Sequence, residues 1–307
     1  SEKFRQAYDL ALAVADSDSS VLVLGESGTG KELVASAIHY ASPRQDKRFL
    51  AINCAALSET LLESQLFGHV KGAFTGAVQA QKGLLEETDQ GTLFLDEVGE
   101  LSQSLQAKLL RVLQEGEFIP VGSTKTKRVD VRFVAATNKN LQNEVTDGHF
   151  RQDLFYRLNV ISIDLPPLRE RTEDIEPLAE HFLRKIAAKS RRQVEGIEPE
   201  ALEMLKSYHW PGNVRELENV MERCSILARD GMITASHLPF QPEIAAPPED
   251  VGLPLNLRDA ERLQVIRALR ETKWNKSRAS QLLGVTRKTI DRKIKEFDLN
   301  PSELLDQ

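Results

Sequence analysis

The sequence is poor in cysteine and has no long apolar run. Its only two cysteines, Cys54 and Cys224, lie far apart, with neither Cys-x-x-Cys spacing nor a nearby histidine pair. Neither a disulfide framework nor a zinc site is indicated, so we expect two buried thiols. No segment approaches the roughly 20 apolar residues of a membrane helix, and no basic stretch followed by an apolar core opens the chain. We therefore expect no membrane span and a reducing, cytoplasmic compartment.

The composition is that of a globular protein, with 41% hydrophobic and 28% charged residues among 307. A chain of this length buries roughly three quarters of the surface that its unfolded form exposes. The net charge of −6 argues against a protein coated in nucleic acid, but the charge is unevenly placed. Between Lys273 and Lys295 eight basic residues stand against one acid, Asp291. This local net charge of +7 indicates where DNA would be held.

Short apolar runs alternate with helical patterns ahead of Pro166. The runs are Val21–Leu24, Phe49–Ile52, Thr92–Leu95, Val131–Ala135 and Val160–Ile163. Helical spacing follows Gly30 and recurs over Ser104–Gln114. Strands that alternate with helices predict an α/β fold, with a parallel sheet sandwiched between helices.

The strand signals stop after Pro167. Apolar residues then recur every three or four positions in Ile175–Ala188, Pro199–Ser207 and Asn213–Ala228, which predicts a helical subdomain. Proline, acidic and small residues without periodicity predict an extended linker after it. We therefore expect an α/β subdomain, a helical lid subdomain, a linker and a separate all-α unit at 1–168, 169–240, 241–254 and 255–307.

A phosphate-binding pattern follows the first apolar run. It reads Gly25-Glu26-Ser27-Gly28-Thr29-Gly30-Lys31, the Walker A pattern, between an expected strand and an expected helix. Backbone N–H groups freed by the glycines wrap a triphosphate at the helix N-terminus, and Lys31 reaches the terminal phosphates. Glu32 stands where most such loops place the Ser or Thr that binds magnesium. The pattern predicts ATP as the ligand.

Two carboxylates end another apolar run, as a Walker B motif requires. Asp96 closes the expected strand and can hold Mg²⁺ through water, while Glu97 can polarise the attacking water. The alternative is that both acids only cap the following helix. Thr137 and Asn138 end a neighbouring run and offer polar side chains suited to sensing the γ-phosphate. Together these motifs predict an Mg²⁺-dependent ATPase.

These residues resemble one family, the AAA+ P-loop activators of sigma-54-dependent transcription, which are bacterial enhancer-binding proteins of the nitrogen-regulator type. The resemblance covers essentially the whole chain and includes the glutamate after the Walker A lysine. Its most specific element is Gly72-Ala73-Phe74-Thr75-Gly76-Ala77, called here the contact loop, which the resemblance implies touches the sigma factor. A glycine-flanked Phe-Thr pair by itself predicts a mobile loop with an exposed aromatic ring and hydroxyl. The alternative is a turn whose Phe74 packs inward.

Other positions carry over from the same resemblance. It implies that Asn53 pairs with Glu97 as a switch, and that Arg151 and Arg157 reach a neighbouring subunit's nucleotide. An arginine in trans stabilises transition-state charge, so dimers assembling to a hexameric ring are implied. Surface ion pairs are the alternative for both arginines. In Trp210-Pro211-Gly212-Asn213-Val214-Arg215, we expect Trp210 in the core, Asn213 as a helix cap and Arg215 on the phosphates.

The last unit has a helix-turn-helix pattern. Leu257–Arg270 predicts an amphipathic helix with Leu257, Ala260, Leu263, Ile266 or Arg267, and Leu269 on one side. Asn275 caps a second helix, Gly284 makes a turn, and Thr286 caps a third. We expect Val285, Ile290, Ile294 and Phe297 to face inward.

Basic side chains remain for the DNA groove on the third helix. They are Arg287, Lys288, Arg292 and Lys295, with Asp291 among them. The unit resembles the factor-for-inversion-stimulation type of DNA-binding domain, and the alternative is a solvated basic helix. The resemblance implies an ATPase that binds enhancer DNA and remodels sigma-54 RNA polymerase at the promoter. A DNA-binding regulator whose ATP site controls only assembly, or a replication-initiator or helicase-loader ATPase, are the competing hypotheses.

Overall fold

The computed structural model describes residues 1–189, 194, 196–228, 231–240, 257–272, 274–297 and 299. The chain divides into two compact units, Ser1–Pro242 and Glu243–Gln307, which are described separately. The expected linker 241–254 lies outside the described residues. The finer division of the first unit at residue 168 stays a prediction. No helix among the described residues is long and apolar enough to cross a bilayer.

A five-stranded parallel sheet forms the centre of the first unit, in the order β2-β3-β6-β1-β7. Its strands are β1 Val21–Leu24, β2 Phe49–Asn53, β3 Thr92–Asp96, β6 Arg132–Thr137 and β7 Ile161–Asp164. These are the five expected runs: β1 matches its run, and the other four differ from theirs by one or two residues at an end. Because Asn53 pairs in register with Asp96 and Leu24 with Thr137, the polar residues that end these strands lie along one edge of the sheet.

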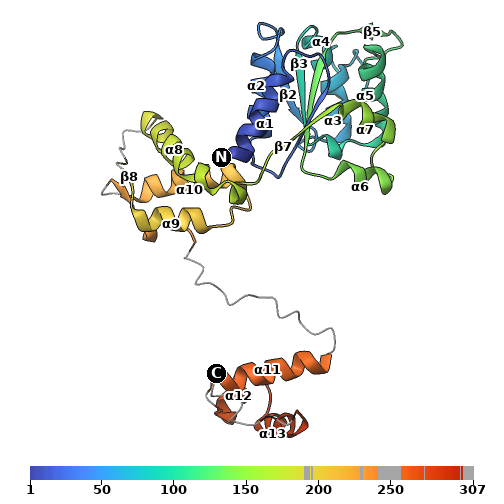
Figure 1. The fold of residues 1–307 in the computed structure, drawn as a ribbon. Helices are drawn as coiled ribbons and strands as arrows, with labels where there is room; N and C mark the ends of the chain where they lie inside the picture. The colour runs from blue at the N-terminus through green and yellow to red at the C-terminus, as the bar shows by residue number, and fades with distance from the viewer. Residues whose placement is uncertain are drawn as a thin grey trace. The chain divides into compact units, whose positions relative to one another are not determined.

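Helices cover both faces of this sheet (Figure 1). Those of the α/β part are α1 Glu2–Ala13, α2 Lys31–Tyr40, α3 Glu59–Phe67, α4 Leu84–Glu87, α5 Gln103–Glu115, α6 Leu141–Thr146 and α7 Gln152–Leu158. One apolar core joins α1 and α2 to one face of the sheet through Val34 and Phe94, among others. A second core joins α3, α5 and α7 to the other face through Leu66, Leu105 and Leu154, among others. The predicted three-layer α/β arrangement is confirmed.

The helical part of the first unit contains α8 Ile175–Lys189, α9 Pro199–Ser207 and α10 Asn213–Leu227. Trp210 is fully buried in its core and donates its indole N–H to Leu205 O, as expected of a packing residue. The expectation that strands stop after Pro167 was wrong, since β8 Gly196–Ile197 pairs in parallel with β9 Met232–Ile233. A hairpin of β4 Glu117–Phe118 and β5 Lys127–Arg128 was also missed. Two-residue strands are too short to leave a periodic signal.

The second unit is a three-helix bundle of α11 Leu257–Glu271, α12 Lys276–Leu282 and α13 Arg287–Glu296. The predicted caps Asn275 and Thr286 accept N–H bonds, and Gly284 adopts the left-handed turn. The predicted inward face of α11 was wrong at Leu263, which is 40% exposed, because Val265 and Ala268 fill the core. Val285 is equally exposed, since it precedes α13 and does not share the inward face of Ile290. The side chains of Leu257 and Ala260 lie outside the described residues.

Candidate functional site

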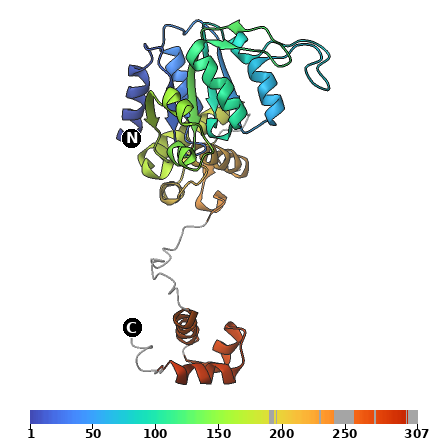
Figure 2. The ribbon, with the colours of Figure 1, turned by 90° about the vertical axis from the view of Figure 1, so that its right-hand side faces the viewer.

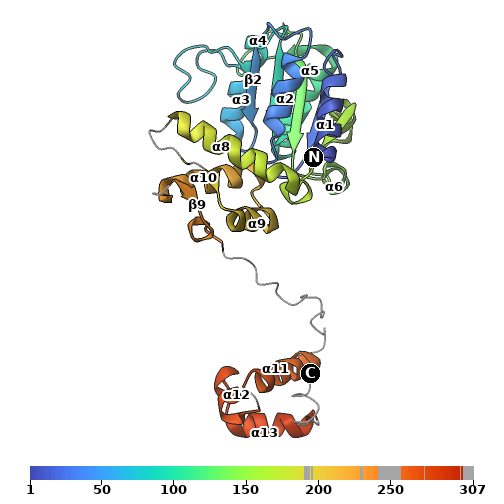
Figure 3. The same ribbon diagram turned by 60° about the vertical axis from the view of Figure 1, so that its left-hand side comes forward.

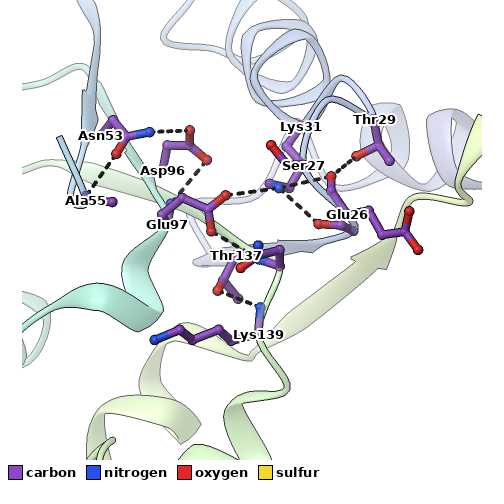
Figure 4. Close-up of polar contacts among 12 residues, drawn as sticks. Glu26, Ser27, Thr29, Lys31, Asn53, Ala55, Asp96, Glu97, Thr137 and Lys139 are labelled. Carbon is purple, nitrogen blue, oxygen red and sulfur yellow. Dashed lines mark hydrogen bonds and ion pairs between the residues drawn. The ribbon is translucent and has the colours of Figure 1, made fainter. Parts of the chain in front are cut away.

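The phosphate loop lies at the edge of the sheet between β1 and α2. Gly28 and Gly30 adopt positive φ angles of 79° and 103°, which glycine accepts without strain. Lys31 begins α2, is only 6% exposed, and donates to Gly25 O at 2.9 Å and Glu26 O at 3.2 Å (Figure 4). Its ammonium group also lies 3.4 Å from a carboxylate oxygen of Glu97. The lysine is thus held at the mouth of the loop.

A cavity of about 300 Å³ opens on this loop. Its lining includes Ser27, Gly28, Gly30, Lys31, Glu32, Asn53, Asp96, Glu97 and Arg215. These residues come from positions as distant in sequence as 27 and 215. The structure therefore brings most of the expected nucleotide-binding residues to one cavity.

The two carboxylates of the β3 end differ in their surroundings. Burial and the neighbouring Glu97 carboxylate raise the pKa of Asp96, an effect that the Lys31 ammonium opposes. Glu97 has a left-handed φ of 53°, which is uncommon for a residue other than glycine. Its second oxygen accepts the Asn138 N–H at 3.2 Å. Asp96 and Glu97 therefore both face the phosphate loop rather than merely capping a helix.

The expected pairing of Asn53 with Glu97 is not found. The Asn53 amide donates to Asp96 at 3.1 Å, and its oxygen accepts the Ala55 N–H at 2.8 Å (Figure 4). Parallel register explains this, because Asn53 and Asp96 are direct partners in β2 and β3. Glu97 lies one residue further on and is bonded to Lys31 and Asn138 instead.

Thr137 and Asn138 lie beside the loop but use different groups from those expected. The Thr137 side chain is 1% exposed, and its hydroxyl accepts the Lys139 N–H at 3.1 Å. Its carbonyl accepts the Gly25 N–H at 3.3 Å, which ties the β6 end to the phosphate loop. Asn138 contributes its backbone N–H to Glu97. Both line a second cavity, which borders Gly25 and Glu26.

Residues 169–171 hold the phosphate loop, and sequence reasoning missed them. Arg169 makes a two-pronged ion pair with Glu26, at 2.9 and 2.6 Å, and this pairing lowers the pKa of Glu26 to about 2. Arg171 is 4% exposed, donates to Thr29 O at 2.9 Å, and lies 4.7 Å from the centre of the Phe4 ring. The sequence signal that could have revealed this contact is the pair of arginines just after Pro167, where the predicted sheet ends.

Asn213 was expected to cap α10, but Gly212 takes that position. Asn213 has a φ of 51° and is fully buried, and its side chain turns away from its own helix. Its oxygen accepts the Leu168 N–H at 2.7 Å, and its amide donates to Glu26 at 3.1 Å and Ser27 O at 3.0 Å. Asn213 thus joins α10 to Leu168 and to the phosphate loop. Its side chain is therefore not available to cap α10.

Two residues in the first turn of α10 also contact the phosphate loop. The Val214 N–H donates to Gly28 O at 3.0 Å, and Arg215 reaches the Ser27 hydroxyl at 3.4 Å. A Cβ on Gly28 would lie 2.4 Å from Gly212 O, so glycine is required for this approach. Arg215 therefore lies at the phosphate loop, and its contact with the phosphates stays a prediction.

Arg151 directly precedes α7, Arg157 lies on it, and neither lines the phosphate cavity. Arg151 is exposed and pairs with Asp153 at 2.6 Å, which raises the pKa of the arginine and lowers that of the carboxylate. Arg157 is also exposed and donates twice to Leu113 O, at 3.1 and 3.0 Å. Neither arginine contacts the nucleotide-binding residues of its own chain among the contacts described.

The contact loop projects from the α/β part between α3 and α4 (Figures 2 and 3). Gly72 and Gly76 have φ angles of 81° and 107°, and Ala77 closes the turn by accepting the Gly72 N–H at 2.9 Å. Thr75 is exposed, as expected. Phe74 is half-buried rather than exposed, because its ring packs edge-on against His69 at 5.0 Å. The loop thus presents the Thr75 hydroxyl to solvent beside the Phe74 ring, which packs on His69.

Residues near Val121 brace the base of the contact loop. The Val70 N–H donates to Val121 O at 3.1 Å, and the Val121 N–H donates to Gly68 O at 2.9 Å. A Cβ on Gly122 would lie 2.8 Å from the Ala73 side chain. The hairpin that contains β4 and β5 therefore packs directly on this loop.

The third helix of the second unit presents a basic surface. Arg287, Lys288, Arg292 and Lys295 are all exposed. Lys293 instead pairs with Glu261 at 2.8 Å and so fastens α13 to α11. Asp291, expected at the groove, pairs with Lys276 of α12 at 2.8 Å. The exposed cations are thus separated from those that hold the bundle together.

Comparisons with known proteins agree with these observations. Residues 1–164 match the family described as "Sigma-54 interaction domain", residues 169–251 the "AAA+ ATPase lid domain", and residues 256–297 the "Bacterial regulatory protein, Fis family". The chain is 53% identical over 302 residues to the Nif-specific regulatory protein of Azotobacter vinelandii, covering 96% of this chain and 58% of that protein. It is 51% identical over 284 residues to the regulatory protein ZraR of Salmonella typhimurium, covering 92% and 64%.

A solved structure gives the same result. NtrX from Brucella abortus in complex with ADP aligns with a TM-score of 0.75 at 36% identity, covering 97% of this chain and 69% of that one. The chain spans less than two thirds of the length of the two regulators above. With its parallel-sheet AAA+ fold, its lid and its Fis-type helix-turn-helix, the chain belongs to the sigma-54-dependent transcriptional activators of the nitrogen-regulator type.

Proposed function

We propose that this chain hydrolyses ATP and uses the energy to remodel sigma-54 RNA polymerase from a closed to an open promoter complex. One observation carries the proposal: Lys31, Asp96 and Glu97 line one cavity in a chain that also projects the contact loop. The NtrX structures with ADP and with ATP support a nucleotide as the ligand.

The residues of the cavity have the chemistry that ATP requires. The loop offers backbone N–H groups at the start of α2, where the helix dipole favours phosphate, and Lys31 supplies the charge. Asp96 offers the carboxylate oxygens that Mg²⁺ prefers, and it would hold the ion through water, since Mg²⁺ keeps several waters and binds with few protein ligands. When bound, Mg²⁺ would neutralise charge on the phosphates. Glu97 is placed to orient and polarise the attacking water.

The arginines of α7 support a ring of identical subunits. Arg151 and Arg157 are exposed and lie outside the cavity of their own chain. An arginine offered to a neighbour's nucleotide contributes roughly 10³–10⁵ in rate in related systems. We therefore propose that dimers assemble to a hexameric ring and that each subunit completes the active site of the next.

The contact loop and the basic helix α13 are the two surfaces that would bind the chain's partners. Thr75 is the exposed polar side chain of the loop, and its half-buried neighbour Phe74 supports it, so we propose this pair as the sigma-54 contact. Arg287, Lys288, Arg292 and Lys295 would hold the chain on double-stranded enhancer DNA.

The test compares three variants in ATPase and promoter-opening assays with sigma-54 RNA polymerase. Lys31→Ala should abolish nucleotide binding, and Glu97→Gln should bind ATP without hydrolysing it. Thr75→Ala should hydrolyse ATP and fail to open the promoter. A Glu97→Gln variant that still opened promoters would refute the proposal and favour a regulator whose nucleotide site controls assembly alone.

A further inference from the structure

A glutamine on α5 lies wholly inside the molecule. Gln106 is 0% exposed, although a side-chain amide is costly to bury without partners. All its polar atoms are bonded: the amide N–H groups donate to Leu101 O at 2.8 Å and His149 O at 3.0 Å. Its oxygen accepts the Arg151 N–H at 2.8 Å. One side chain therefore joins two segments that are distant in sequence.

The first segment leads directly from the catalytic carboxylates. Glu97 begins a single 3₁₀ turn, Val98–Glu100, in which the Glu100 N–H donates to Glu97 O at 3.0 Å. Leu101 follows that turn and is 5% exposed. Gln106 thus holds the carbonyl that lies four residues after Glu97.

The second segment carries the arginines. Arg151 is the residue before α7, and its backbone N–H has Gln106 as its acceptor. Further along α5, the Leu113 carbonyl accepts the Arg157 guanidinium. Residues of α5 therefore contact the Arg151 backbone and the Arg157 side chain, and one of them also holds the segment after Glu97.

We propose that Gln106 is a positioning residue that fixes Arg151 for the neighbouring subunit and couples it to the segment after Glu97. This inference rests on the proposed function, because it requires that Arg151 act on a neighbour's nucleotide. Its physical basis is that a displacement of about 1 Å at such a group costs roughly 10²-fold in rate.

The first experiment measures steady-state ATPase of the full chain for Gln106→Met, which keeps the volume and removes all three bonds. We expect kcat to fall about 10–100-fold while KM for ATP changes less than about twofold. Gln103→Met is the matched control, since Gln103 is exposed one turn earlier and donates to Gly148 O in the same segment.

The second experiment mixes subunits. Lys31→Ala subunits lack a working nucleotide site but present an intact Arg151, whereas Gln106→Met subunits have the reverse defect. Their mixture should hydrolyse ATP faster than the sum of the two alone, with a maximum at an intermediate ratio. Arg151→Ala mixed with Lys31→Ala is the positive control. If Gln106→Met does not fold, Gln106→Asn, which keeps the amide but shortens its reach, replaces it in both experiments.

Two results would overturn the inference, and they are distinguishable. If Gln106→Met raises KM for ATP as well as lowering kcat, as a damaged nucleotide site would, Gln106 does not act through Arg151. The same conclusion follows if it gains nothing on mixing while the Arg151→Ala control gains. If Arg151→Ala itself hydrolyses ATP at the wild-type rate, Arg151 does not act in trans and this inference fails, while the proposed ring mechanism then rests on Arg157.

Discussion

Replacing Asn213 by glycine should loosen the lid from the phosphate loop without straining the backbone. Glycine accepts the φ of 51° found there, so the substitution removes only the side chain and its bonds to Leu168 N, Glu26 and Ser27 O. Such bonds contribute about 0.5–1.5 kcal/mol each, and the unsatisfied Leu168 N–H adds about 1–3 kcal/mol. The low ends of these ranges sum to about 2.5 kcal/mol. If about 1.4 kcal/mol of this appears as weaker nucleotide binding, affinity falls about tenfold.

The assay is calorimetric titration of the full chain with ADP, together with thermal unfolding. Val220→Ala is the matched control, because Val220 lies on the same helix, is 7% exposed in the lid core, and makes no contact with the phosphate loop among the described contacts. Its loss should cost a comparable 1.5–3 kcal/mol, roughly the value of a buried valine. Equal ADP affinities in two equally destabilised variants would show that Asn213 serves only the stability of the lid.

Three further results are expected. Arg292→Ala and Lys295→Ala should each weaken DNA binding and flatten the plot of log affinity against log salt by about 0.9, measured by fluorescence anisotropy; unchanged slopes would place these residues away from the duplex. The lowered pKa of Glu26 contributes stability that is complete above pH 4.5 and is lost as pH falls through about 2. Because this pair is exposed and screened by solvent its contribution is small, and unfolding midpoints of Arg169→Met should depend less on pH in that window than those of the wild type. Gly122→Ala should leave ATPase activity intact and weaken sigma-54 binding, because the added methyl group presses on the base of the contact loop; unaltered binding would show that the loop tolerates the displacement.

The sequence predicted those parts of the fold that depend on local signals. Five apolar runs gave five strands within two residues of their true ends, and the caps Asn275 and Thr286 were confirmed. Parallel strands bring their carboxyl ends to one edge, so Lys31 and Asp96 could be expected together before the structure was known.

Errors arose where a distant partner decided the outcome. Asn213 had the residue type of a helix cap, but its side-chain amide donates to Glu26, 187 positions earlier in the chain. The pairing expected for Asn53 moved by one residue, because strand register selects Asp96. In α11, leucine spacing favoured Leu263, whereas packing against α12 and α13 buries Val265. Local pattern carries no information on such choices between equally plausible partners.

The contacts that Arg171, Asn213 and Val214 make with the phosphate loop follow from the geometry of phosphate binding itself. A loop that turns its N–H groups toward phosphates must turn carbonyls outward, and these need donors. Lys31 serves Gly25 O and Glu26 O, whereas Ser27, Gly28 and Thr29 receive donors from residues 171–214. Since Arg171, Asn213 and Val214 supply those donors, we expect lid docking and nucleotide binding to be linked by one coupling free energy. Nucleotide should then stabilise the docked lid by the same factor by which docking improves nucleotide affinity.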